Sequence, residues 1–201
     1  LFDEPLSNLD AKLRDHVRME IRALQREHGF TAVYVTHDQS EALAMSDLVI
    51  VMRAGVIEQI GRPEEIYRHP VNRFVADFIG SPSMNFIEGV VAADTDGPFV
   101  MAADGTRLAI SPKSAATVGQ RVIYGARPEH LILPSGPLGF DAAIEVVEPT
   151  GPNIQIFADV AGKRICALTT ERRTFAPGQT IRLHCPEESV HLFDASSGMR
   201  I

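Results

Sequence analysis

The residues that could do chemistry lie in two short stretches near the start of the chain. Asp3 and Glu4 follow Leu1-Phe2, at what reads as the end of a buried strand. Neighbouring residues at a strand end can point in different directions, so one carboxylate can hold Mg²⁺ through water while the next orients a nucleophilic water. His37 ends the β-branched run 31–36, where it could donate a hydrogen bond to a phosphate oxygen. Taken singly, an acidic pair also fits a surface loop, and a lone histidine also fits a structural role.

The elements around these stretches alternate helix and strand. Apolar residues at positions 13, 17, 21 and 24 form one stripe of a helix, which Asp10 can cap and Gly29 can end. Residues 31–36 predict a buried parallel strand. A short helix over 40–45 follows, and then a hairpin with strands 48–52 and 56–60. Pro63 and Pro70 suit the first positions of two further helices.

After residue 83 the helical period gives way to short apolar runs separated by Gly and Pro turns. This pattern predicts a barrel or a sandwich. The segments 116–122 and 175–181 look alike, and each precedes a Pro-Glu and then a His-Leu, which indicates two related β-modules. The predicted strands cover 86–91, 99–102, 107–110, 121–124, 140–147, 154–160, 163–168 and 180–184.

The composition excludes several classes of protein. Lys plus Arg number 19 and Asp plus Glu 26, so the net charge is 19 − 26 = −7, which disfavours nucleic acid as a ligand. No apolar run approaches the roughly 20 residues of a membrane helix, and no signal peptide is visible. Cys166 and Cys185 are too few for a disulfide scaffold and match no zinc spacing. The chain begins at Leu1 without a methionine, so we expect it to be part of a longer protein.

Together, the order and spacing of these motifs resemble the second half of an ABC-transporter nucleotide-binding domain. Residues 1–5 are similar to the end of its Walker B strand, 7–10 to its D-loop and 35–38 to its switch-histidine loop. The resemblance implies that Asp3 coordinates Mg²⁺ through water. It implies that Glu4 is the general base and that His37 contacts the γ-phosphate of ATP.

The D-loop resemblance also assigns Ser7 and Asp10 to the nucleotide site. It implies that Asp10 communicates across a head-to-tail dimer that encloses two ATP molecules. No phosphate-binding loop and no Leu-Ser-Gly-Gly-Gln signature occurs in the 201 residues. By themselves they are therefore expected neither to bind ATP in the micromolar range nor to hydrolyse it.

The resemblance extends along the rest of the chain. Residues 80–86 are similar to the junction in ATPase subunits of maltose- and glycerol-3-phosphate-type carbohydrate importers, and 125–131 and 191–194 to their regulatory domain. The implied fold is an α/β remnant of a P-loop ATPase domain in 1–80, followed in 81–201 by an all-β regulatory domain of two OB-like modules of the TOBE type. Polyamine- and anion-type importers share this plan, and the stretch 81–86 favours sugar.

The resemblance implies an ATPase subunit that lies peripherally on the cytoplasmic face of the inner membrane. Its expected partners are a second copy of itself, membrane-spanning permease subunits and, indirectly, an extracytoplasmic solute-binding protein. Alternatively, the β-region is a module that senses a small ligand or a regulatory protein. In the 201-residue chain we expect an open strand edge and a bare apolar face, Val33 and Val35 included, which a second copy would cover.

Overall fold

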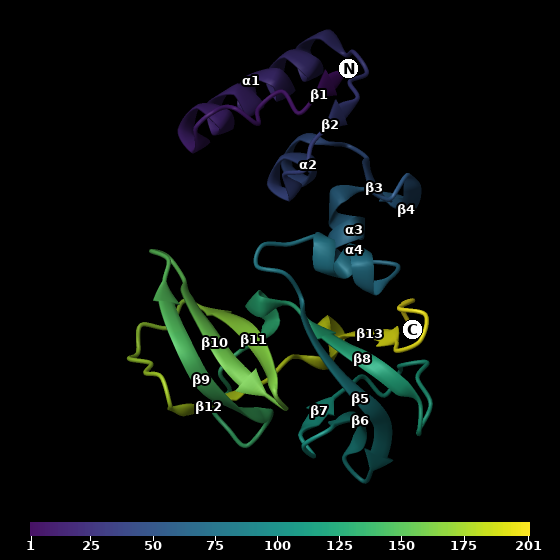
Figure 1. Ribbon diagram of the computed structural model, residues 1–201, viewed down its shortest axis with the longest axis vertical. Helices are drawn as coiled ribbons and strands as arrows, with labels where there is room; N and C mark the ends of the chain where they lie inside the picture. The colour runs from purple at the N-terminus through teal and green to yellow at the C-terminus, as the bar shows by residue number, and fades with distance from the viewer. The chain divides into compact units, whose positions relative to one another are not determined.

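The computed structural model describes the chain from residue 1 to residue 201, apart from the side chain of residue 11. Its contacts divide the chain into two units, which are described separately (Figure 1). Unit 1 comprises residues 1–71 and 78–80, and unit 2 comprises 72–77 and 81–201. A single boundary after residue 80 would have left 72–77 in the first part. Their packing, given below, explains why they belong to unit 2.

Unit 1 holds a short parallel sheet, a hairpin and three helices (Figure 1). The strands β1 and β2 pair in parallel, and β3 and β4 pair antiparallel. The elements are β1 (Phe2–Asp3), α1 (Ala11–His28), β2 (Tyr34–Val35), α2 (Gln39–Met45), β3 (Val49–Arg53), β4 (Val56–Gly61) and α3 (Pro63–Arg68).

The predicted limits of α1 are confirmed. The Asp10 carboxylate accepts a hydrogen bond from the Leu13 N–H at 3.0 Å, which is the bonding of an N-cap. Gly29 ends the helix with φ of 65°, a left-handed conformation that glycine adopts without strain. The strand predicted over 31–36 is shorter than expected, because β1 offers only two residues for it to pair with.

The helix that Pro70 was expected to open starts later. Helix α4 covers Arg73–Phe78, and the side chain of Asn72 accepts a hydrogen bond from the Val75 N–H at 2.9 Å. Asn72 therefore provides the N-terminal cap, and Pro70 lies in the preceding loop. The position of Pro63 as the first residue of α3 is confirmed.

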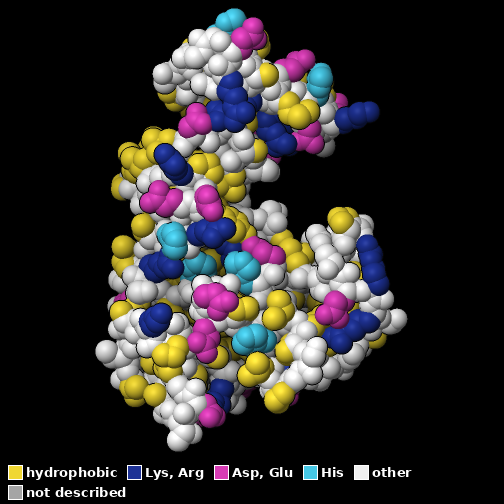
Figure 2. Space-filling view, turned by 180° about the vertical axis from the view of Figure 1, so that it is seen from behind, with side chains coloured by type: hydrophobic (Ala, Val, Ile, Leu, Met, Phe, Trp, Pro, Cys, Tyr) yellow, Lys and Arg dark blue, Asp and Glu magenta, His cyan; other side chains and the backbone are white. Residues whose placement is uncertain are grey.

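Both faces of the β3–β4 hairpin are apolar. Val49 and Val51 are buried, while the opposite face presents large apolar side chains to solvent. Figure 2 shows hydrophobic side chains gathered over these strands. The exposed residues, each between 50% and 63% exposed, are Leu48, Ile50, Met52, Val56, Ile57 and Ile60. The apolar face near β2 is also open, as expected, since Val33 and Val35 are 59% and 47% exposed. That a second copy of the chain covers this face stays a prediction.

Unit 2 consists of two antiparallel sheets around one core (Figure 1). The five-stranded sheet has the order β13-β8-β5-β6-β7, and the four-stranded sheet has the order β11-β10-β9-β12. The strands are β5 (Asn85–Asp94), β6 (Gly97–Ala102), β7 (Arg107–Ala109), β8 (Arg121–Ala126), β9 (Phe140–Pro149), β10 (Ile154–Val160), β11 (Lys163–Thr169), β12 (Thr180–Leu183) and β13 (His191–Asp194). The predicted combination of a small α/β part and an all-β part is thus confirmed, and β13 is a strand that the sequence pattern missed.

The internal repeat is confirmed in detail. In each copy a glycine with positive φ precedes the last strand, and its N–H donates to the long first strand of the module. In each copy a glutamine side chain accepts a hydrogen bond from the N–H three residues earlier. The matching bonds are Gly119 to Val91 and Gly178 to Ile144, both 2.8 Å, and Thr117 to Gln120 and Ala176 to Gln179, at 3.1 and 3.3 Å.

The two modules exchange their final segments. After β12 the chain passes through the 3₁₀ helix η2 (Glu187–Ser189), and β13 then pairs with β8 of the first module. After β8 it passes through η1 (Pro128–His130), and Ile132 then exchanges two backbone hydrogen bonds with His184 of the second module, both 2.9 Å. Each module is therefore completed by residues of the other.

Residues 72–77 belong to unit 2 because α4 closes a small core there. Ala76 packs with Met84, Ile123 and Phe193, all less than 5% exposed, and Phe86 packs against this cluster. The Arg73 N–H also donates to the carbonyl of Gly198 at 2.8 Å. Helix α4 is thus an outer cover of the five-stranded sheet.

This packing predicts the stability of two truncated chains. Residues 72–201 should melt about 5 to 10 °C higher than residues 84–201, since the shorter chain uncovers Met84, Ile123 and Phe193 at a cost of roughly 2 kcal/mol. Thermal unfolding followed by circular dichroism measures the difference. Equal melting temperatures would show that α4 does not stabilise the sheet.

The two cysteines are free and buried. Burial raises the pKa of the Cys166 thiol to about 11 and that of Cys185 to about 12. A group with so high a pKa is almost wholly a thiol at pH 8, and the thiolate is the reactive form. The structure therefore gives these residues no redox or nucleophilic role.

Alkylation tests this assignment. At pH 8 iodoacetamide should modify both cysteines at least 100 times more slowly in the folded chain than in urea. Folding buries both sulfur atoms and lowers the fraction of each cysteine that is present as thiolate. Mass spectrometry of peptides containing Cys166 and Cys185 gives the two rates. Labelling of folded protein at the rate of the unfolded chain would contradict the burial described here.

Candidate functional site

The parallel pairing of β1 with β2 brings the two chemical stretches together. The N–H of Phe2 donates to the Val33 carbonyl at 2.8 Å, and the N–H of Glu4 donates to the Val35 carbonyl at 2.9 Å. Parallel strands present their carboxyl ends at one edge of a sheet. The residues that follow β1 and β2 therefore lie at the same edge.

At this edge Glu4 and His37 are in contact. Glu4 Oε1 lies 3.1 Å from His37 Nδ1, and the two side chains are 47% and 72% exposed. Both groups are accessible to a ligand from solvent. A carboxylate and an imidazole in contact can accept, donate or relay a proton, which is the chemistry of general acid–base catalysis.

The backbone of Glu4 is strained. Its φ is 44°, in the left-handed region, where a residue other than glycine costs on the order of 1 kcal/mol or more. The Ser7 N–H and hydroxyl both donate to the Glu4 carbonyl, at 3.3 and 2.9 Å. Ser7 therefore holds the turn that directs Glu4, and strain of this kind is frequent at functional sites.

The remaining predicted site residues lie at the end of β1 and in the loop between β1 and α1. The Asp10 carboxylate caps α1 and is exposed. Asp3 is exposed at the end of β1, and within the described chain no hydrogen bond or ion pair involves its carboxylate. Asp3 is thus available to a ligand, whereas Ser7 and Asp10 already have structural partners.

The sequence analysis missed Glu41, a buried carboxylate beneath the His37 loop. Glu41 is 3% exposed and accepts hydrogen bonds from the hydroxyls of Tyr34 at 3.1 Å and Thr36 at 2.7 Å. Burial first, and then the charge of Glu41, raise the pKa of Tyr34 well above its usual value. The sequence shows only an acidic residue in a predicted helix, and that does not reveal whether the carboxylate is buried or exposed.

On the other side of His37, Asp38 caps helix α2. Its carboxylate accepts hydrogen bonds from the Ser40 N–H at 2.8 Å and the Ser40 hydroxyl at 2.6 Å. The bond from the Ser40 hydroxyl, with smaller help from backbone N–H groups and Arg14, holds the pKa of Asp38 below its usual range. Asp38 is therefore a charged cap, and the loop is fixed both before and after His37.

The carboxylates at the site fit one kind of magnesium coordination, in which the protein supplies only one or two of the ligands. Among the described residues no group of three or more His, Cys, Asp or Glu side chains could hold a metal ion. Mg²⁺ is commonly held by one or two carboxylates, with waters and substrate phosphates completing the octahedron. The exposed carboxylate of Asp3, next to Glu4, fits that arrangement and could hold Mg²⁺ together with a bound nucleotide.

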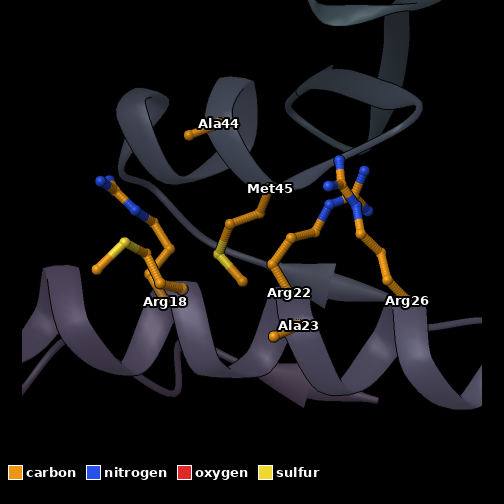
Figure 3. Close-up of a pocket in the computed structure, with 7 residues that line it drawn as sticks. Arg18, Arg22, Ala23, Arg26, Ala44 and Met45 are labelled. Carbon is orange, nitrogen blue, oxygen red and sulfur yellow. The ribbon is translucent and has the colours of Figure 1, made fainter.

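A groove of about 310 Å³ lies between α1 and α2 (Figure 3). Figure 3 shows Met45 reaching down from α2 between Arg18 and Arg22 of α1. Arg22 is paired with Asp47 through both terminal nitrogens. The lining has no acid, nucleophile or histidine, so this groove is not a catalytic site; it consists of Arg18, Met19, Arg22, Ala23, Arg26, Ala44 and Met45.

Models of two known domain families match the β-region. The MalK OB fold domain matches residues 80–131, and the TOBE domain matches residues 124–193. The two matches together cover the β-modules of unit 2. Among the described helices none is long and apolar enough to cross a membrane.

Relatives match the chain from end to end. An uncharacterised ABC transporter ATP-binding protein, y4oS of Sinorhizobium fredii, is 49% identical over 100% of this chain and 53% of its own length. The chain is homologous to the ATP-binding proteins of ABC transporters. The sn-glycerol-3-phosphate import ATP-binding proteins UgpC 1 of Rhizobium johnstonii and UgpC of Yersinia pestis are 42% and 41% identical, over 98% and 100% of this chain and 54% and 56% of their own lengths.

The chain spans about half the length of the curated relatives it matches. Among solved structures, the molybdate-binding protein ModG overlaps 54% of this chain and 94% of its own, at a TM-score of 0.45 and 17% identity. That likeness is too weak to carry an argument about fold or ligand.

The cap of α1 gives a test of the role of Asp10. Asp10→Ala should lower the free energy of unfolding of unit 1 by about 1 kcal/mol, whereas Asp10→Asn, which can still accept the Leu13 N–H, should change it little. Urea unfolding followed by helical circular dichroism measures both. An equal loss in the two variants would mean that the charge of Asp10, and not its cap bond, is what stabilises the helix.

Proposed function

We propose that this chain is part of the ATPase subunit of an ABC-type importer, in which ATP hydrolysis drives uptake of a carbohydrate-type substrate. The observation that carries the proposal is the contact of Glu4 with His37 at 3.1 Å, at the ends of paired parallel strands. Homology to ABC ATP-binding proteins over the whole chain supports it.

In this proposal Glu4 is the general base. Its carboxylate is exposed and held in a fixed turn by Ser7, so it can accept a proton from a water that approaches the site. ATP would supply the phosphoanhydride bond. Asp3 would hold Mg²⁺ through water, and the ion would supply charge that neutralises the phosphates. The described residues do not include a phosphate-binding loop, which other parts of the protein would provide.

His37 would face the terminal phosphate with the nitrogen that Glu4 leaves free. A neutral imidazole carries one N–H, so a ring that donates from Nδ1 to Glu4 can only accept at Nε2. The doubly protonated ring donates from both nitrogens. A ring that holds the carboxylate of Glu4 and a phosphate oxygen at the same time must therefore donate from both nitrogens.

The proposal extends to partners and location. An ATPase subunit of this kind works as a homodimer on the cytoplasmic face of the inner membrane, bound to permease subunits that receive substrate from a solute-binding protein. Asp10 would lie near the dimer contact. The TOBE-type region would be the regulatory domain, where a regulatory protein or small ligand could bind.

The substrate is proposed from the relatives whose names state one. Those named for a substrate are sn-glycerol-3-phosphate importers, at 41% to 42% identity. We therefore place the substrate among sugars and polyol phosphates. Uptake of radiolabelled glycerol 3-phosphate by cells with and without the gene discriminates this substrate from a sugar.

Substitution of the general base is the direct test. In the full-length protein Glu4→Gln should slow ATP hydrolysis by on the order of 10²-fold or more and leave ATP binding intact, because the amide has the shape of the carboxylate but cannot accept the proton. His37→Ala should also impair hydrolysis. Phosphate release gives the rate, and equilibrium binding of a fluorescent ATP analogue gives the affinity.

A matched control lies on α1. Glu20 forms an exposed ion pair with His16, with Oε1 and Nε2 3.3 Å apart, and so repeats the Glu4–His37 contact outside the site. Glu20→Gln should leave the rate of hydrolysis unchanged. Turnover by Glu4→Gln at the wild-type rate would refute the assignment of the base.

A further inference from the structure

Arg14 joins the two loops that meet at the candidate site. Its side chain leaves the first turn of α1, and its nitrogens contact both loops. Nη2 donates to the Leu9 carbonyl at 3.1 Å, and Nη1 donates to Asp38 Oδ2 at 3.5 Å. Nε lies 3.9 Å from Glu41 Oε1, within the range of an ion pair.

The first contact fixes the loop that carries Ser7 and Asp10. The Leu9 N–H donates to the carbonyl of Leu6 at 3.2 Å, and Leu6 is buried. The Leu9 carbonyl is held by Arg14. Leu9 is thus tied at both its N–H and its carbonyl, directly before the residue that caps α1.

The other two contacts fix the loop that carries His37. Thr36 donates its hydroxyl to Glu41 and accepts the Asp38 N–H at 2.9 Å, so the residues on both sides of His37 are held. Arg14 faces Glu41 and Asp38 together. The position of the His37 imidazole therefore depends on the guanidinium of Arg14, which belongs to α1.

The chemistry of arginine suits this position. A guanidinium is planar and always charged, and offers donors in several fixed directions, whereas an ammonium is a single point of charge. The buried carboxylate of Glu41 requires a compensating cation, since an unpaired buried charge is costly. Lysine at position 14 would retain the charge but could not reach Leu9, Asp38 and Glu41 in these three directions.

We propose that Arg14 is a positioning residue that couples the Ser7–Asp10 loop to the His37 loop, so that the two loops move as one body. The catalytic part of this inference rests on the proposed function, because it requires that His37 acts on a bound nucleotide. The mechanical part, the coupling of the two loops, rests on the contacts of Arg14 alone.

Amide hydrogen exchange in the 201-residue chain without nucleotide tests the coupling. Arg14→Lys should speed exchange of the Leu9 and Asp38 amides about tenfold. Glu41→Gln, at a residue that among the described residues has no hydrogen bond or ion pair with the Ser7–Asp10 loop itself, should also speed exchange at Leu9 through the Arg14–Glu41 contact. This effect should disappear in the Arg14→Lys background. The control is Arg18→Lys, on the same helix and paired with Asp15 at 3.0 Å, which should change neither amide.

Kinetics of the full-length protein test the catalytic consequence. Arg14→Lys should lower kcat about tenfold with the KM for ATP changed less than twofold. In a His37→Ala background the same substitution should cause no further loss. A residue that only stabilises the fold would lower kcat by the same factor in both backgrounds.

The outcomes separate the two proposals. The coupling is overturned if Glu41→Gln leaves the exchange rate of the Leu9 amide unchanged. It is also overturned if Glu41→Gln raises that rate by the same factor in the Arg14→Lys background. Should Arg14→Lys fail to fold, Glu41→Gln still decides the matter through exchange at Leu9. Full-length protein without ATPase activity would refute the proposed function and leave the exchange result standing as the test of Arg14. Losses of kcat that multiply in the double variant overturn the positioning role.

Discussion

The parallel pairing of β1 with β2 is the constraint on which the candidate site depends. Two backbone hydrogen bonds, from Phe2 to Val33 and from Glu4 to Val35, set the register of the strands. A slip of one residue would turn every side chain to the opposite face of the sheet. The contact of Glu4 with His37, the strained turn at Glu4 and the network beneath His37 all presuppose this register.

So short a ladder cannot hold two strands by itself, and the polar network supplies part of what the sheet lacks. Glu41 ties the end of β2 to α2, and Arg14 ties both to α1. In this network Glu41 accepts hydrogen bonds from two hydroxyls, whereas Arg14 Nε has an ion-pair contact with Glu41 and, among the described residues, no hydrogen bond. Hydrogen bonds and ion pairs around the site thus join β2, α1 and α2 of unit 1.

Much of the site was predictable from the sequence, and the reasons are local. The order of an acidic pair, a capped helix and a β-branched run ending in His37 predicted that the pair and the histidine each follow a strand, and the pairing of β1 with β2 then brings Glu4 and His37 together. The roles of Arg14 and Glu41 were not predictable, because a charged residue on a helix gives no sign of the loop that its side chain reaches. In unit 2 the turn residues predicted most strands. Strand β13 was missed because four residues show too little alternation, and residues 72–77 were assigned to the first part because only tertiary packing shows what α4 covers.

The exchange of end segments between the two β-modules has a consequence for synthesis of the protein on the ribosome. Strand β8 has β5 on one side early in translation, but its other neighbour, β13, lies about 70 residues further along the chain. The first module therefore emerges with an open strand edge, which stays exposed until residues 191–194 have left the exit tunnel. A chaperone, or a second nascent chain on the same messenger, would meet that edge first.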